Sequence, residues 1–329
     1  MIEFIITFFA SIIIAPIVIC VAKKLKFGQN ILGYVSEHSY KQGTPTMGGL
    51  IFILPTVLIS LFFLKSDITA GLICLTVFIG YGLVGFLDDF IKIKFKQNLG
   101  LRAYQKIIFQ ILIALFVSVY IYRNQLFLNA IYLPFSNIKI DLGLFIIPFV
   151  IILFLATTNS VNLTDGLDGL AGSVSLIVFI AITIVNSLYI NSSVALNQEY
   201  LTQLQNLNSI SMCLSGGLLA FLVFNFYPAK IFMGDTGSLA IGGLLAIVCA
   251  LNGLSLYILV FGAMFVLSAI SVIIQVVFFK CTKKRVFLMA PFHHHLQHKG
   301  MHETKIVFIY IVITLMLTLI GIALLRGIL

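Results

Sequence analysis

The chain has 329 residues, of which 60% are hydrophobic and only 9% are charged. An average soluble domain is about a quarter charged, so this composition excludes an ordinary soluble globular protein. The mean hydropathy is +1.13, and the formal net charge is +9. These values are typical of a chain surrounded mostly by lipid, and the first question is therefore its membrane topology.

Ten apolar runs are candidates to cross a membrane, which takes about 20 predominantly apolar residues. They are centred on 2–22, 47–64, 68–87, 103–122, 143–158, 170–190, 209–227, 237–252, 255–279 and 305–325. The first run contains Glu3 in place of a basic leader and has no small-residue cleavage site, so we expect a membrane helix and not a signal peptide. The expected fold class is an all-α polytopic membrane protein, with residues 1–329 forming a single integral membrane domain.

The charges predict the orientation, because Lys and Arg accumulate in cytoplasmic loops. Sixteen of the 20 basic residues fall in the odd-numbered loops, and the remaining ones are Lys65, Arg123, Lys139 and Arg326. We therefore expect the amino terminus outside and the odd-numbered loops in the cytosol. Seven of the 11 acidic residues and all six histidines share the cytoplasmic side, which indicates a site at that face.

Two further observations narrow the functional classes. The spans contain no charged residue or histidine near their middle, whereas a proton- or ion-coupled transporter usually carries some. The five cysteines are scattered singly, without a CxxC, and we interpret them as small apolar fillers.

Adjacent carboxylates end the third span, in GFLDDFIKIKFKQNLGLRAYQK. Asp88 and Asp89 are followed one helical turn later by Lys92. One interpretation is an interfacial cap neutralised by lysines. The other is a Mg²⁺ site or a phosphate-linked general base, because Mg²⁺ prefers one or two carboxylates together with substrate phosphates and water. The pair alone does not decide between them.

A second polar segment, TTNSVNLTDGLDGLAGS, follows the fifth span. Asn162, Asp165 and Asp168 are spaced three apart, so on a helical turn they would share one face. The intervening glycines allow a close approach of the backbone. A helix cap needs only one such residue, and the segment therefore favours a ligand-binding turn.

A third segment, FNFYPAKIFMGDTGSLAIGG, contains Asn225, Lys230, Phe232 and Asp235. Asp235 can be interpreted as the N-cap of the eighth span. The same helix terminus is also suited to a metal–phosphate cluster, with the carboxylate on the metal and backbone N–H groups on a phosphate. Phe232 is a candidate to stack on a nucleobase, although a lone Phe more often serves packing.

The segment APFHHHLQHKGMH brings five histidines into one loop: His293, His294, His295, His298 and His302. The last four include an i, i+4, i+8 set that would suit zinc, but Gly300 interrupts that helix and no HExxH is present. A role of these histidines beside a diphosphate, as hydrogen-bond donor or acid–base partner, is favoured.

A fifth segment, EHSYKQGTPTMGGL, opens the second span with Lys41 and Thr46. It suits either ordinary helix-entry punctuation or a loop that contacts phosphate or sugar.

These five segments, in this order and on one predicted membrane face, resemble the phospho-N-acetylmuramoyl-pentapeptide transferases, which make the first lipid-linked precursor of bacterial peptidoglycan. The resemblance spans about residues 36 to 305. The wider superfamily transfers sugar 1-phosphates from UDP-sugars to polyprenyl phosphates and shares the paired acids and the NxxD turn. The triple histidine and KQGTPTMGG favour the muramoyl branch, with a UDP-N-acetylglucosamine-1-phosphate transferase as the alternative.

The resemblance implies a Mg²⁺-dependent enzyme of the bacterial inner membrane. It implies transfer of phospho-N-acetylmuramoyl-pentapeptide from UDP-MurNAc-pentapeptide to undecaprenyl phosphate, giving lipid I and UMP. It also implies a homodimer in contact with membrane lipid and no nucleic-acid partner. A transporter of lipids or nucleotide sugars and a zinc-dependent membrane hydrolase are the rival classes.

The resemblance also implies roles for individual residues. The implied catalytic residues are Asp88, Asp89, Asp235 and His293, with Asp235 as the Mg²⁺ ligand. The implied substrate-binding residues are Lys41, Thr46, Lys106, Asn162, Asp165, Asp168, Asn225, Phe232 and His294. Lys106 matches less closely, because Gln105 precedes it where the family usually has Arg. Leu296-Gln297 stands where the family commonly has Phe-Glu. A role that belongs to the Glu carboxylate in the family is therefore not carried over to Gln297.

Overall fold

The computed structural model describes residues 1–25, 43–95, 100–124, 126, 130–136, 138–192 and 197–326. Its helices are α1 (Ile2–Lys24), α2 (Leu50–Phe63), α3 (Thr69–Lys94), α4 (Ala103–Arg123), α5 (Ile146–Thr164), α6 (Leu170–Ser192), α7 (Gln198–Asn225), α8 (Gly234–Leu251), α9 (Ile258–Phe261), α10 (Ala263–Thr282), α11 (Phe292–His298) and α12 (Glu303–Arg326). Two 3-10 turns, η2 (Gly143–Phe145) and η3 (Ser255–Tyr257), precede α5 and α9. Strands β1 (Ala130–Tyr132) and β2 (Lys139–Asp141) pair antiparallel, with Ala130 opposite Asp141.

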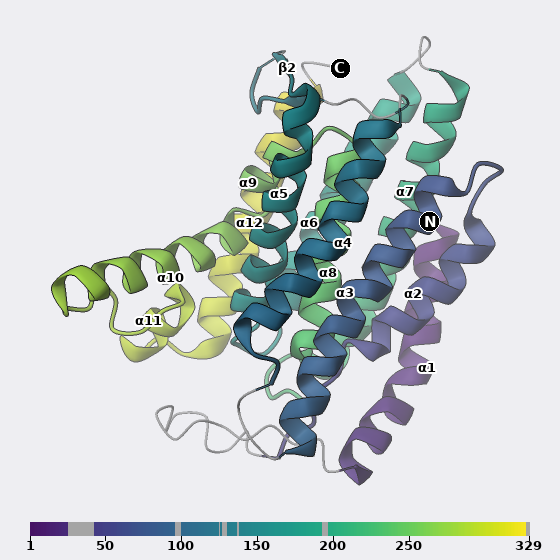
Figure 1. The fold of residues 1–329 in the computed structure, drawn as a ribbon. Helices are drawn as coiled ribbons and strands as arrows, with labels where there is room; N and C mark the ends of the chain where they lie inside the picture. Colours follow the sequence, from purple (N-terminus) through teal and green to yellow (C-terminus); the bar gives the residue numbers. More distant parts are fainter. Residues whose placement is uncertain are drawn as a thin grey trace.

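The long helices other than α10 run up and down through one bundle, and α10 and α11 lie to one side of it (Figure 1). Nine helices in the described ranges are long and apolar enough to cross a membrane, and the apolar α2 has 14 residues. In lipid each backbone N–H and C=O must be bonded within its own segment, which is why apolar runs of this length form helices. The expected class, an all-α polytopic membrane protein, is confirmed.

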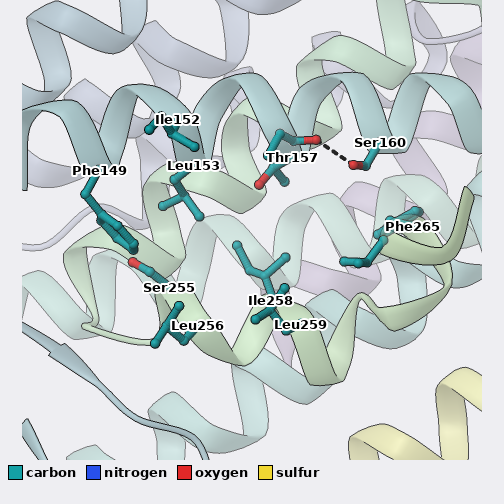
Figure 2. Close-up of a pocket in the computed structure, with 12 residues that line it drawn as sticks. Phe149, Ile152, Leu153, Thr157, Ser160, Ser255, Leu256, Ile258, Leu259 and Phe265 are labelled. Carbon is teal, nitrogen blue, oxygen red and sulfur yellow. Dashed lines mark hydrogen bonds between the residues drawn. The ribbon is translucent and has the colours of Figure 1, made fainter. Parts of the chain in front are cut away.

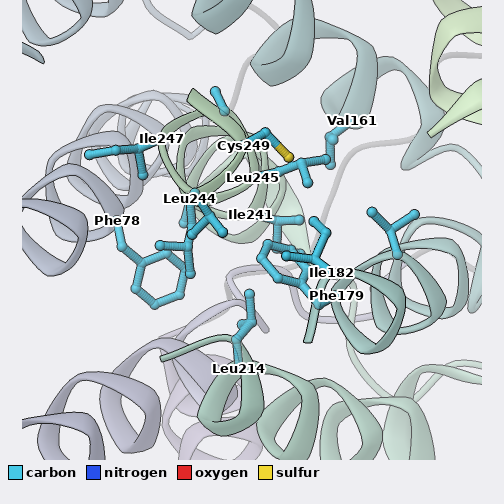
Figure 3. Packing of buried hydrophobic residues seen from close by; sticks show 14 of the residues in the cluster. Phe78, Val161, Phe179, Ile182, Leu214, Ile241, Leu244, Leu245, Ile247 and Cys249 are labelled. Carbon is cyan, nitrogen blue, oxygen red and sulfur yellow. The ribbon is translucent and has the colours of Figure 1, made fainter. Parts of the chain in front are cut away.

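Helix α8 forms the centre of the bundle, and every residue from 236 to 251 is buried. Figure 3 shows Ile241 and Leu244 of α8 beside Phe78 of α3, Phe179 of α6 and Leu214 of α7. Because lipid tails are as apolar as these side chains, association inside a bilayer depends on close packing more than on exclusion of water. Small residues permit that packing.

Gly85 shows how closely α3 approaches α8. A Cβ atom at Gly85 would lie 2.6 Å from the backbone nitrogen of Thr236 and would also overlap the carbonyl group of Asp235. Only a glycine fits at this crossing. The backbones are therefore in contact one turn before Asp88, and the cytoplasmic end predicted for α3 lies directly against the start of α8.

The ninth apolar run, centred on 255–279, is divided at Gly262, and its expected span corresponds to α10 (Ala263–Thr282). Helix α9 ends at Phe261, Gly262 has φ −97° and ψ 23°, and α10 begins at Ala263. A Cβ at Gly262 would lie 2.9 Å from the carbonyl oxygen of Ile258, so the lack of a side chain allows the bend. Helix α10 then extends away from the bundle (Figure 1).

Candidate functional site

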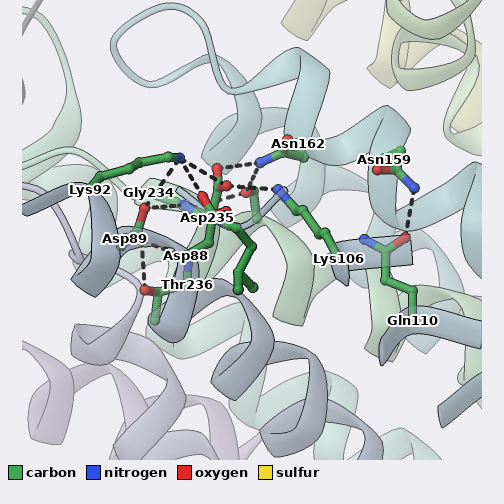
Figure 4. Close-up of polar contacts among 12 residues, drawn as sticks. Asp88, Asp89, Lys92, Lys106, Gln110, Asn159, Asn162, Gly234, Asp235 and Thr236 are labelled. Carbon is green, nitrogen blue, oxygen red and sulfur yellow. Dashed lines mark hydrogen bonds and ion pairs between the residues drawn. The ribbon is translucent and has the colours of Figure 1, made fainter. Parts of the chain in front are cut away.

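Three carboxylates meet where α3 ends and α8 begins (Figure 4). Asp88, Asp89 and Asp235 each offer an oxygen atom, and these atoms lie within 4.8 Å of one another. No other group of three His, Cys, Asp or Glu side chains in the described ranges is arranged to hold an ion. The described histidines therefore do not form the zinc site considered from their spacing.

Two lysines balance these carboxylates. Nζ of Lys92 lies 2.5 Å from Oδ2 of Asp88 and 3.1 Å from Oδ2 of Asp235. Nζ of Lys106, from α4, lies 2.7 Å from the same oxygen of Asp235. The pairing of Lys92 with the acid one turn earlier is as the sequence predicted, and Lys106 joins the site from a different helix. Buried charges persist only when paired in this way.

Asp89 caps α8 from a neighbouring helix. Oδ1 of Asp89 accepts a hydrogen bond from the backbone N–H of Asp235 at 3.2 Å. Oδ2 of Asp89 accepts two more, from the backbone N–H of Thr236 at 2.9 Å and from the Thr236 hydroxyl at 2.7 Å. A carboxylate at a helix N-terminus is stabilised by the helix dipole. Asp235 is thus not the cap, contrary to one sequence interpretation, and its side chain is turned toward the lysines.

Asn162 joins the cluster from the last turn of α5. Its Nδ2 donates to Oδ1 of Asp235 at 2.7 Å and to Oγ of Ser238 at 2.9 Å. Helix α5 ends at Thr164, so the expectation that Asn162, Asp165 and Asp168 share one helical face is wrong. Oδ2 of Asp168 instead accepts the backbone N–H of Ala229 at 2.9 Å.

Asp165 directly follows α5 and lies near the other carboxylates. Burial, followed by the negative charges of Asp235 and Asp89, raises the pKa of Asp165 to about 8. The Asp165 carboxyl therefore carries a proton at neutral pH unless a cation binds nearby.

Two buried side chains hold the turn that contains Asp165. Oε1 of Glu303 accepts the N–H of Asp168 at 2.5 Å, and Oδ1 of Asn225 accepts the N–H of Gly169 at 3.0 Å. Nδ2 of Asn225 donates to the carbonyl oxygen of Ile231 at 2.9 Å. Sequence reasoning missed Glu303. Its signal is that it is the only acidic residue after Asp235.

Two histidines of α11 lie against the same turn. A Cβ at Gly166 would lie 3.0 Å from Nε2 of His294 and closer still to Nε2 of His293. His293 is fully buried, and its ring nitrogens have no hydrogen-bond partner among the described residues. Burial holds the pKa of His293 well below its usual 6.5, so the ring is neutral at pH 7. Nδ1 of His294 lies 2.9 Å from Oε1 of Gln297.

The loop before α2 reaches the start of α8. The N–H of Phe232 donates to the carbonyl oxygen of Pro45 at 2.8 Å, and the N–H of Gly48 donates to that of Phe232 at 2.8 Å. Thr46 is buried, with its Oγ1 placed 2.7 Å from where a Cβ of Gly234 would lie. Lys41 lies outside the described residues, and its predicted role stays a prediction.

A largely apolar cavity of about 160 Å³ lies between α5, α9 and α10 (Figure 2). Thr157 and Ser160 of α5 and Ser255 of η3 are the polar residues that line it, and Ser160 precedes Asn162 by two residues. Ile152 and Leu259 line the cavity while remaining 65% and 56% exposed. The cavity is therefore open toward the apolar surface of the bundle, and it extends along α5 from Phe149 to Ser160.

A membrane-embedded helical bundle with a lysine-balanced carboxylate cluster at one end defines a class of polytopic proteins suited to phosphate chemistry at a membrane face. Residues 69–253 match the model of glycosyl transferase family 4, and residues 41–53 match signature 1 of the phospho-N-acetylmuramoyl-pentapeptide-transferases. The chain belongs to glycosyl transferase family 4 and, within it, to the phospho-N-acetylmuramoyl-pentapeptide-transferases.

Proteins of that name are similar to this chain along nearly their whole length. The phospho-N-acetylmuramoyl-pentapeptide-transferase of Clostridium botulinum (strain Eklund 17B / Type B) is 45% identical over 312 residues, covering 94% of this chain and 92% of its own. Those of Clostridium kluyveri (strain NBRC 12016) and Clostridioides difficile (strain 630) are 44% and 43% identical and each cover 96% of this chain. The matched regions cover 96% and 95% of the lengths of these two relatives, respectively.

Proposed function

We propose that this chain transfers phospho-N-acetylmuramoyl-pentapeptide from UDP-MurNAc-pentapeptide to undecaprenyl phosphate in the bacterial inner membrane. The products are lipid I, a precursor of peptidoglycan, and UMP. Full-length similarity to transferases of that name supports this proposal. The observation that carries it is the cluster of three carboxylates and two lysines, built from α3, α4 and α8 at one end of the bundle.

The reaction joins two phosphate anions. An oxygen atom of the lipid phosphate attacks the phosphorus atom that bears the sugar. The bond from that phosphorus to the bridging oxygen breaks, and UMP leaves with the electron pair. Lys92 and Lys106 are placed to neutralise the oxygen atoms of both partners, because fixed cations in a site that excludes water stabilise charge at low reorganisation cost.

The oxygen donors of the cluster fit Mg²⁺, which takes carboxylate and phosphate ligands. We assign Asp235 as the protein ligand, and Asp88 accepts the proton of the lipid phosphate or orients it. Bound Mg²⁺ would neutralise charge on the diphosphate of the donor. Asp89 keeps the start of α8 in place, since its oxygen atoms already accept hydrogen bonds from α8.

The remaining site residues are assigned to substrate binding as proposals. Asn162, which donates to Asp235, is assigned together with Asp165 and His294 to the donor diphosphate. Lys41, Thr46, Asp168, Asn225 and Phe232 are assigned to the nucleotide-sugar end, with Asp168 and Asn225 acting through the shape of the turn that they hold.

The acceptor is assigned to the cavity between α5, α9 and α10. Its tail would pack against Leu153 and Leu259, and its phosphate would point past Ser160 toward Asn162. The distribution of basic residues in the sequence supports the proposal that the carboxylate cluster faces the cytosol.

The test is UMP release by the purified protein in detergent with Mg²⁺ and undecaprenyl phosphate. We expect release with UDP-MurNAc-pentapeptide and none with UDP-N-acetylglucosamine. Asp88→Asn should abolish transfer while nucleotide binding persists, and Lys94→Gln, at an exposed position on the same helix, is the matched control. Release only from the glucosamine donor would move the chain to the other branch of the superfamily. Full turnover in Asp88→Asn would remove that residue from the reaction.

A further inference from the structure

The end of α10 carries a cluster of cations outside the bundle. The segment from residue 280 to 285, called the basic tip below, contains four exposed basic residues: Lys280, Lys283, Lys284 and Arg285. The helix ends there because Lys283 adopts a left-handed conformation with φ 57°. Helix α10 projects sideways from the bundle (Figure 1), so the basic tip lies away from the carboxylate cluster.

No ion pair involves the basic tip in the part of the chain that the structure describes. The sequence contains no Asp or Glu between Asp235 and Glu303, and the ion pairs among the described residues involve Lys92, Lys106 and the amino terminus. Four like charges within six residues repel one another unless an external anion neutralises them. The basic tip is therefore complementary to a surface of fixed negative charges.

The apolar neighbours of the basic tip indicate where that surface lies. Phe278 and Phe279 before it are 41% and 44% exposed, and Val286 and Leu288 after it are 45% and 52% exposed. Exposed apolar side chains on both sides of a basic segment are typical of a helix end at the boundary between acyl chains and headgroups. Anionic phospholipids supply negative charge at that boundary.

The segment from residue 286 to 291, called the return segment below, connects the basic tip to the histidines of α11. Oε1 of Gln275 in α10 accepts the N–H groups of Val286 and Phe287 at 3.1 and 2.9 Å. Nδ1 of His295 in α11 accepts the N–H of Leu288 at 3.1 Å, and Oγ of Ser271 accepts that of Phe292 at 3.0 Å. Hydrogen bonds thus connect α10 and α11 to the segment that follows the basic tip.

We propose that the basic tip binds the headgroups of anionic phospholipids and thereby holds α10 and α11 where His293 and His294 contact Gly166. The preference of Lys and Arg for cytoplasmic loops requires only that this loop be basic. The hydrogen bonds from α10 to the return segment and α11 add a path from the headgroups to the site. The effect on catalysis rests on the proposed function, whereas the binding of lipid does not.

The first experiment measures lipid contact directly. The chain contains no Trp, so Leu288→Trp provides a single fluorophore beside the basic tip. In nanodiscs, brominated phosphatidylglycerol should quench this Trp more strongly than brominated phosphatidylcholine at equal mole fraction. The excess should disappear when Lys280, Lys283, Lys284 and Arg285 are all replaced by Gln. Equal quenching by the two lipids in the otherwise unchanged protein would overturn the proposal.

The second experiment measures UMP release at saturating acceptor in phosphatidylcholine nanodiscs with increasing phosphatidylglycerol. The unmodified protein should gain several-fold in rate, and the four-site variant should gain nothing. Lys23→Gln with Lys24→Gln, which removes exposed cations from the end of α1, is the matched control and should respond normally. Equal gains in all three proteins would overturn the role of the basic tip. Loss of transfer in every protein, with selective quenching intact, would contradict the proposed function alone.

Discussion

At the scale of single residues, Asp235 is the side chain that joins the site. It accepts hydrogen bonds from Lys92, Lys106 and Asn162, which belong to three different helices. The sequence separates these donors from Asp235 by 143, 129 and 73 positions. Motif spacing identified Asp235 and Asn162 as candidates, but it could not show that they touch, because only the packing of α3, α4 and α5 on α8 brings them together.

Lys106→Gln tests the contribution of the second ammonium group. A hydrogen bond between charged groups contributes about 1.5–3 kcal/mol, so we expect turnover to fall roughly 10- to 150-fold. The apparent affinity for Mg²⁺ should rise, because the lysine no longer occupies Oδ2 of Asp235. Steady-state UMP release over a Mg²⁺ titration measures both effects. Unchanged turnover would show that Lys106 serves only the resting fold.

The raised pKa of Asp165 predicts a pH dependence of stability. Its folded-state pKa of about 8 lies above the reference value of 3.8, so the folded form retains a proton that the unfolded form has lost. The contribution of Asp165 to the free energy of unfolding should therefore decrease as pH rises from about 4 to about 8 and then level off. Thermal unfolding with chelator present should show a weaker decline in Asp165→Asn than in the unmodified protein. Asp141→Asn, on β2, should show the original decline.

Glu303 tests whether the turn must be held from α12. Glu303→Ala would leave the buried N–H of Asp168 without this acceptor, which costs about 1–3 kcal/mol, whereas Glu303→Gln retains an acceptor oxygen. We expect a lower melting temperature and a higher KM for the nucleotide donor in the Ala variant only. If both variants behave alike, the negative charge of Glu303 matters more than the hydrogen bond.

At the scale of helices, apolar length predicted the existence of the spans better than their ends. Residues 198–208 were missed because they are polar, yet they continue α7. Gln203 and Asn206 are buried there and accept the N–H groups of Ala70 and Lys65. Hydropathy counts such residues against a span, although a bonded polar side chain is tolerated in the interior. The bend at Gly262 was missed for a related reason, since glycine does not lower hydropathy enough to mark a break.

Gly85→Ala tests the contact between α3 and α8. The added methyl group would overlap the backbone of Asp235 and Thr236, and overpacking of this kind costs about 1–3 kcal/mol. Separation of the helices would move Asp88 away from Asp235, so we expect at least a tenfold loss of UMP release. Gly80→Ala is the matched control on the same helix, because its methyl group would meet only the side chain of Ile113. Equal activity of the two variants would contradict the argument.

At the scale of the whole molecule, apolar length predicted the fold class, whereas the cytoplasmic position that charge asymmetry predicts for the candidate site stays a prediction. The individual contacts in the site depend on the conformation of turns, which the hydrophobic periodicity of the sequence does not predict. The Asp168 carboxylate accepts a hydrogen bond from the backbone N–H of Ala229, and the carboxylate of Asp89, on α3, caps α8. Both arrangements follow from the crossing of α3 and α8 and from the break after α5, and these are properties of the assembled bundle.

The opening between α5, α9 and α10 has a kinetic consequence. A lipid that enters there never leaves the plane of the bilayer, so it meets the protein by two-dimensional diffusion. Encounter frequency is then set by how many acceptor molecules share each unit of membrane area. Diluting a fixed amount of acceptor with additional detergent should slow UMP release in proportion to its mole fraction in the mixed micelle, while its bulk molarity stays constant. A rate that follows bulk molarity would mean that the acceptor arrives through water, and the composition of the surrounding leaflet would then cease to control the flux.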